Sequence, residues 1–304
     1  MPRFERGVQS FPIFSHPSPL RWSPRHQPAG AEHSGHADAV QVESDRYGLT
    51  QTLAAAPQLV ARWQDAQTAA PYGWAVLTAA LDAARLGARS PLSADLLRAA
   101  AGYCTSRQQA EAPENWFDQA LAYATTKLLG AAAALSPAGV GMGQIVGYNA
   151  ADYLIQHAIR ERHYARVPAS TWDAILSCVR DPADAARLAY NARRRLLYRY
   201  AIPMYRRASD EGDWLAGEVL NGLLAERGDL DELRARADEG HEDAARWLAG
   251  LLAERGDLEG LRARAYVGDQ DAGERLVRLL NEQGRLDEAE RLRRFGLNPD
   301  GSIA

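Results

Sequence analysis

The strongest constraint on this chain is a 28-residue period in its last third. Glycines mark that interval at Gly212, Gly240, Gly268 and Gly296. Leucines keep the same interval at Leu220, Leu248 and Leu276. A fixed period in this range is typical of proteins that stack copies of one supersecondary unit. The period therefore predicts an array of repeated units over residues 201–296.

One unit runs from Leu230 to Asp257. Its first half places apolar residues on one helical face, and Asp229 is positioned to cap the first turn. Gly240 can adopt the left-handed conformation that ends a helix. The second half again has one apolar face, which includes Leu248. Each unit is therefore predicted to be a helical hairpin that needs its neighbours, because isolated helices this short are marginal in water.

The rest of the chain predicts helices and no strands. The proline-rich start, residues 1–45, has too little apolar surface to fold and is expected to be disordered. Residues 46–200 carry helical patterns, and residues 297–304 form a tail. Among the expected helices, one runs from about Glu114 to Leu135, one over Asn149–Val167, and one to about Tyr200 that Asp181 caps with Pro182 in its first turn. The glycine-rich segment Ser136–Tyr148 lacks the lysine and preceding strand of a phosphate-binding loop, and is interpreted as an interhelix loop. The predicted fold is all-α: an α-solenoid of hairpins preceded by an irregular helical domain.

Composition and charge favour a globular cytoplasmic protein. Hydrophobic residues make up 46% of the chain and the net charge is −4. No apolar run is long enough to span a bilayer, so no membrane association is expected. The start MPRFERGVQS has no apolar core of a secretion signal. Cys104 and Cys178 are expected to be reduced and buried.

No group of residues has the spacing of a catalytic, cofactor or metal site. Four histidines in the proline-rich start have no regular ligand spacing, and His157 and His163 do not share a helix face. We therefore expect a non-enzymatic protein without a cofactor. The four histidines are His16, His26, His33 and His36.

Two sets of arginines are candidates for contact with a partner. Arg234 and Arg262 recur on the first helix of successive units and are candidate contacts for a protein or peptide. The segment 190–207 interleaves arginine with tyrosine, a pattern used by nucleic-acid surfaces. Packing of its apolar residues explains the same segment without a ligand, so both interpretations stay open. The candidate nucleic-acid patch consists of Arg193, Arg194, Arg199 and Arg206.

Two resemblances bear on these interpretations. The hairpins resemble short tetratricopeptide and Sel1-type repeats, although their period differs from that of tetratricopeptide repeats. The stretches GLTQTLAAAPQLV at 48–60, ENWFDQALAYATTKLLGAAAALSP at 114–137 and GMGQIVGYNAADYLIQHA at 141–158 resemble the C-terminal helical region of actinobacterial regulatory proteins. So do DPADAARLA at 181–189 and YRRASDEGD at 205–213. In that family the region follows a STAND-type ATPase or a helix-turn-helix module, and neither is recognisable here.

Together these observations favour an interaction scaffold. The resemblance implies the sensor or repeat arm of a bacterial regulatory system without its ATPase or DNA-binding module. The partner would be a protein or peptide, because solenoids expose extended surfaces. The alternative is a nucleic-acid-binding regulator that uses residues 190–207.

Overall fold

The computed structural model describes residues 56–128 and 132–304, and these residues are mostly helical. The prediction of a mostly helical fold is confirmed. The predicted disorder of residues 1–45, and the four histidines there, lie outside the described residues. Within them, no helix is both long enough and apolar enough to cross a lipid bilayer.

The first half is organised around α2 (Pro71–Leu86), which follows a helix over residues 56–69. α2 is buried on nearly every side and contacts α5, α6 and η1. Its alanines let these neighbours approach on several faces, as expected for a helix that is apolar all round. The surrounding elements are α3 (Ala94–Arg98), η1 (Ala99–Tyr103), α4 (Ser106–Ala110), α5 (Trp116–Thr125), α6 (Asp152–Glu161) and α7 (Ala169–Cys178).

The expectation that this half contains no strands is wrong. Strands β1 (Leu135–Gly141) and β2 (Gln144–Ala150) pair antiparallel, with Leu135 opposite Ala150. Gly143 turns the chain with φ of 74°. The base of this hairpin is tied to the body of the fold, because the N–H of Leu92 donates to the carbonyl of Tyr148 and the reverse bond also forms, both at 2.9 Å. The glycine-rich segment is therefore a β-hairpin and not an interhelix loop.

Because of the hairpin, two helix ends differ from their predicted positions. α5 stops at Thr125, although a helix was expected to continue to Leu135, and the hydroxyl of Thr126 donates to the carbonyl of Ala122 at 2.6 Å. α6 starts at Asp152 instead of Asn149, because residue 149 belongs to β2. Four glycines in the hairpin dilute the period-two pattern that would otherwise predict strands.

Helix α8 (Pro182–Arg193) begins as predicted, with Asp181 capping it and proline in the first turn. It does not continue to Tyr200. Leu196 adopts φ of 59°, and the N–H of Leu197 donates to the carbonyl of Ala192 at 2.9 Å, a Schellman closure. α9 (Tyr198–Asp210) then starts, so Pro203 lies inside this helix.

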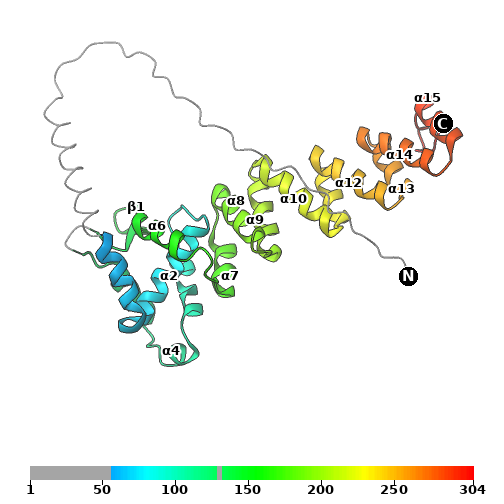
Figure 1. The fold of residues 1–304 in the computed structure, drawn as a ribbon. Helices are drawn as coiled ribbons and strands as arrows, with labels where there is room; N and C mark the ends of the chain where they lie inside the picture. The colour runs from blue at the N-terminus through cyan, green and yellow to red at the C-terminus, as the bar shows by residue number, and fades with distance from the viewer. Residues whose placement is uncertain (1–55, 129–131) are drawn as a thin grey trace, which may run out of the picture. The chain divides into compact units, whose positions relative to one another are not determined.

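Six helices follow α9, and each of the last four begins 28 residues after the helix two before it. α10, α12 and α14 contact one another in series, and each also contacts the shorter helix after it (Figure 1). Leucines 28 residues apart, Leu220, Leu248 and Leu276, are fully buried. The six are α10 (Trp214–Arg227), α11 (Leu230–Asp238), α12 (Glu242–Glu254), α13 (Leu258–Tyr266), α14 (Gln270–Glu282) and α15 (Leu286–Phe295).

Local signals define the ends of these helices. Asp229 accepts from the N–H of Glu232, as its predicted capping role requires. Gly228 and Gly240 have positive φ at the ends of α10 and α11. The buried apolar side chains form one continuous core from Leu59 to Ala289, without a gap near residue 200. The boundary between the helical domain and the hairpins stays a prediction.

Candidate functional site

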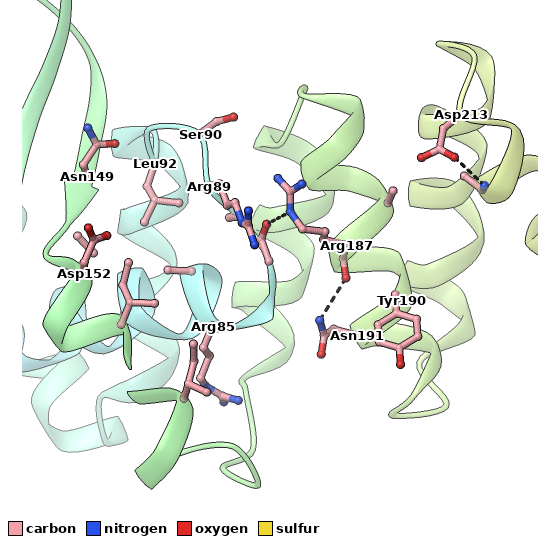
Figure 2. A pocket seen from close by; sticks show the side chains of 18 of the residues that line it. Arg85, Arg89, Ser90, Leu92, Asn149, Asp152, Arg187, Tyr190, Asn191 and Asp213 are labelled. Carbon is pink, nitrogen blue, oxygen red and sulfur yellow. Dashed lines mark hydrogen bonds between the residues drawn. The ribbon is translucent and has the colours of Figure 1, made fainter. Parts of the chain in front are cut away.

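A pocket of about 1180 Å³ lies between the helices of the first half and α10. Its walls come from the end of α2 and the loop after it, the end of β2 and the start of α6, and from α8, α9 and α10. In the view of Figure 2, Asn149 and Asp152 stand at one end, Asp213 stands at the other, and Arg89 and Arg187 lie between them. The pocket is therefore lined by segments that are far apart in the sequence.

One wall of the pocket is fixed by the buried carboxylate of Asp184 in α8. It accepts hydrogen bonds from the backbone N–H groups of Arg89 at 3.0 Å and Ser90 at 2.8 Å. It also pairs with the guanidinium of Arg187, whose Nε donates to the carbonyl of Gly87 at 2.9 Å. Gly87 has φ of 125°, and a Cβ there would lie 2.6 Å from that of Arg187. Only glycine lets this loop approach α8 so closely.

Behind the pocket, two guanidiniums share one buried carboxylate. Asp82 of α2 accepts from Nε of Arg85 at 2.7 Å and from Nε of Arg162 at 3.0 Å. The hydroxyl of Tyr103 donates to the same carboxylate at 2.8 Å. Burial raises the pKa of Tyr103, and the negative charge of Asp82 raises it further. This cluster carries an excess of positive charge.

Other arginines around the pocket add to that excess. Arg195 does not line this pocket, but it donates to the backbone carbonyl of Asn191, which does, at 2.9 Å; burial lowers the pKa of Arg195, with the like charge of Arg85 contributing. Arg89 and Arg193 line the pocket with exposed side chains. Within the described residues, neither of these two forms an ion pair with a carboxylate. Their guanidiniums are therefore available to an anionic ligand.

The aliphatic part of the pocket lining comes from α6 and α10. Leu215 and Val219 line the pocket from this helix, and Ile155 and Ile159 line it from α6. Leu215 and Ile159 are exposed. The pocket thus combines unpaired guanidiniums with accessible aliphatic side chains.

The face of α10 that lines the pocket continues onto the next helices. The indole of Trp247 in α12 lies against Gly222, 3.7 Å from where a Cβ would be. The guanidinium of Arg275 in α14 lies against Gly250 in the same way, at 3.8 Å. Trp247 remains exposed. A surface of corresponding positions therefore runs from the pocket along α10, α12 and α14.

The four arginines of the predicted nucleic-acid patch are spread over different surroundings. Arg199 pairs with Asp173 at 2.9 Å, and Nε of Arg206 donates to Glu232 at 2.8 Å. Arg194 lies over the ring of Tyr190, with its guanidinium carbon 5.8 Å from the ring centroid. Arg193 is the member that lines the pocket. The structure therefore gives carboxylate partners to two of the four.

The two predicted contact arginines of the repeats lie on their own helices beside an acid three residues earlier. Arg234 pairs with Asp231 at 3.2 Å, and Arg262 pairs with Glu259 at 3.2 Å. Neither arginine lines the pocket. They repeat at a position where an intrahelical ion pair engages one nitrogen of each guanidinium, and the buried Nε of Arg262 has no hydrogen-bond partner among the described residues.

Sequence reasoning missed the arginines two residues further on, Arg236 and Arg264, which are buried. Arg236 donates to Oδ1 of Asn221 and to Oγ of Ser209, both at 2.8 Å, and so joins α9, α10 and α11. Arg264 pairs with Asp238 and Asp269. Their spacing equals the repeat period, which signals a structural role, but arginine alone does not indicate burial.

The remaining candidate chemistry is sparse. Within residues 56–128 and 132–304, no group of three or more His, Cys, Asp or Glu side chains is placed to hold a metal ion. His157 packs edge-on against Trp63, with ring centroids 6.0 Å apart. Cys104 and Cys178 are both free, as expected, but half-buried rather than buried.

Comparison with known proteins gives no relative. No protein-family model, curated protein sequence or solved structure matches this chain. The resemblance to actinobacterial regulatory proteins stays a prediction, and the function is argued from the pocket and the surface beside it.

Proposed function

We propose that this chain is a non-enzymatic scaffold that binds a protein partner along the pocket and the adjoining face of α10, α12 and α14. The helices after residue 200 would form a solenoid of hairpins related to short tetratricopeptide or Sel1-type repeats. The observation that carries the proposal is that Leu215 in the pocket and Trp247, which lies against α10 from the next hairpin, both expose apolar side chains. Exposed apolar surface of this kind marks interaction sites in many proteins.

The contacts of the helices support this arrangement. α10, α12 and α14 contact one another in series, whereas their partner helices do so less. Helices that approach more closely line the inner side of a curved stack, which is the side on which solenoids bind extended partners. The pocket would then be one end of that binding surface.

A regulatory role follows from the proposed lineage. If the chain is the sensor arm of a bacterial signalling system, its partner would be another component of that system. The nucleic-acid alternative has less support, because Arg199 and Arg206 already bind carboxylates. That alternative predicts retention of DNA or RNA at low salt and a steep loss as salt rises.

Replacement of Leu215 by glutamate tests the proposed surface. The immobilised full chain is compared with Leu215→Glu and with Leu286→Glu, a matched change of an exposed leucine at the start of α15. Proteins retained from a bacterial lysate are quantified by mass spectrometry. A specific partner should be retained by the wild type and by Leu286→Glu, and lost from Leu215→Glu.

Two results would count against the proposal: no protein enriched over a blank support, or equal retention by the wild type and Leu215→Glu. A further variant, Arg234→Ala with Arg262→Ala, tests the arginines that the sequence singled out. Their intrahelical ion pairs predict unchanged retention.

A further inference from the structure

The charge around the pocket is unbalanced in favour of arginine. Asp82 forms ion pairs with both Arg85 and Arg162. Within the described part of the chain, Arg89 and Arg193 have no carboxylate partner. The carboxylate of Asp213 is engaged as the cap of α10, where it accepts from the N–H of Ala216 at 3.0 Å.

Asp152 opposes this charge, but only at the end of the pocket where it stands beside Asn149 (Figure 2). A pocket with surplus guanidiniums attracts anionic groups, and arginine can bind a carboxylate through two parallel hydrogen bonds.

The shape and apolar wall of the pocket indicate an extended ligand. Its volume of about 1180 Å³ lies above the range of roughly 300–1,000 Å³ that is usual for small-molecule sites. Leu215, Val219 and the ring of Tyr190 offer apolar surface beside the free guanidiniums. The surface also continues beyond the pocket to Trp247. A compact anion would leave most of this surface unused, whereas a peptide segment would cover it.

We infer that the pocket binds an acidic peptide segment of the protein partner. Carboxylates of the segment would be held by Arg89 and Arg193, and a neighbouring apolar side chain would pack on Leu215 and Tyr190. This inference rests on the proposed partner-binding function and adds the chemistry of the segment that is bound. The backbone of the segment can hydrogen-bond to the exposed side chains of Ser90 and Asn149 along the same pocket.

Neutralising the two arginines tests the inference without disturbing the loop that carries Arg89. Its backbone N–H, and not its side chain, bonds to Asp184. The variant is Arg89→Gln with Arg193→Gln. The matched control is Arg227→Gln with Arg293→Gln, since Arg193, Arg227 and Arg293 all lie in the last turn of a helix. Circular dichroism verifies that both variants fold.

The probe is a random peptide library displayed on phage and selected on the full chain. Selected peptides are synthesised, and their affinities are measured by fluorescence anisotropy. We expect selected sequences to place Asp or Glu beside Leu, Ile or Phe. Binding should weaken about tenfold or more in the double variant, as expected for loss of charge-assisted hydrogen bonds. The control variant should bind as the wild type does.

Two outcomes would overturn the inference, and they separate it from the proposed function. If selected peptides lack acidic residues, or bind the double variant as tightly as the wild type, the acidic-segment inference fails. The proposed function stands in that case if Leu215→Glu abolishes their binding. If selection yields no peptide that binds the wild type, both proposals fail.

Discussion

Two ion pairs of identical spacing allow the energetic role of the buried cluster behind the pocket to be measured. Asp82 and Arg85 pair on α2 with side chains that are 0% and 2% exposed. Asp95 and Arg98 pair on α3 with side chains that are 82% and 53% exposed. Both pairs join residues three apart in a helix, but Asp82 is buried and also binds Arg162 and Tyr103. The perturbation is Asp82→Asn, with Asp95→Asn as its control.

The structure sets the expected magnitude for Asp82→Asn. Asparagine offers one acceptor oxygen and a donor amide, so the amide would face the N–H and O–H donors of Arg162 and Tyr103. The charge of Arg85 would also lose its buried partner. Removing one member of a buried ion pair costs about 3–5 kcal/mol. The exposed pair of Asp95 is screened by water and its loss costs about 0.2–1 kcal/mol.

Urea unfolding followed by circular dichroism and tryptophan fluorescence measures this difference. With a slope of roughly 2–3 kcal/mol per M, the midpoint of Asp82→Asn should fall by about 1–2.5 M, and that of Asp95→Asn by about 0.5 M or less. Equal midpoints for the two variants would refute the reasoning, because burial would then make no difference to the ion pair.

Three further substitutions test single features. Tyr103→Phe loses the hydrogen bond to Asp82 and should cost about 1–2 kcal/mol at pH 7. Because burial raises the folded-state pKa of Tyr103, the wild type should lose stability as pH rises through about 10. The difference in unfolding free energy between the wild type and Tyr103→Phe should therefore shrink at high pH. A difference that stays constant from about pH 8 to 11 would contradict this. Leu196→Gly relieves a left-handed residue that is 71% exposed, so the melting temperature should rise by about 1–4 °C, and a fall would contradict the assignment of strain. Gly87→Ala would place a Cβ 2.6 Å from that of Arg187, at a φ of 125°. The free energy of unfolding in urea should therefore fall by about 2–3 kcal/mol. An unchanged midpoint would show that the loop can shift.

Helix positions in the last third could be predicted from the sequence because their signals are local. A glycine at positive φ, an aspartate cap and apolar spacing define most of these helix ends within a few residues, as at Gly228 and Asp229. The same reasoning placed the start of α8 at Asp181 and Pro182. Its other end was missed, because Leu196 occupies a left-handed position that usually indicates glycine.

The β-hairpin and the pocket could not be predicted, because both depend on contacts between distant segments. Gly147 is needed where the chain passes Leu92, since a Cβ would lie 2.8 Å from its carbonyl oxygen. The pocket joins Arg89, in a loop with no motif, to Arg193 at the end of α8. Arg234 and Arg236 both repeat with the period, and only packing distinguishes the exposed one from the buried one.

The claim that the last third is built from interchangeable stacked hairpins has a direct test. Deleting residues 230–257 removes one 28-residue unit and joins Asp229 to Leu258. Arg264 would then take the place of Arg236 against Asn221 and Ser209. The comparison is a deletion of residues 230–253, which breaks the register. Both are followed by circular dichroism during urea unfolding.

We predict that the variant lacking residues 230–257 keeps a single cooperative transition and loses only the helical signal of the deleted residues. The variant lacking residues 230–253 should lose helix beyond the deletion. The claim would be contradicted if the two deletions lost the same excess of helical signal.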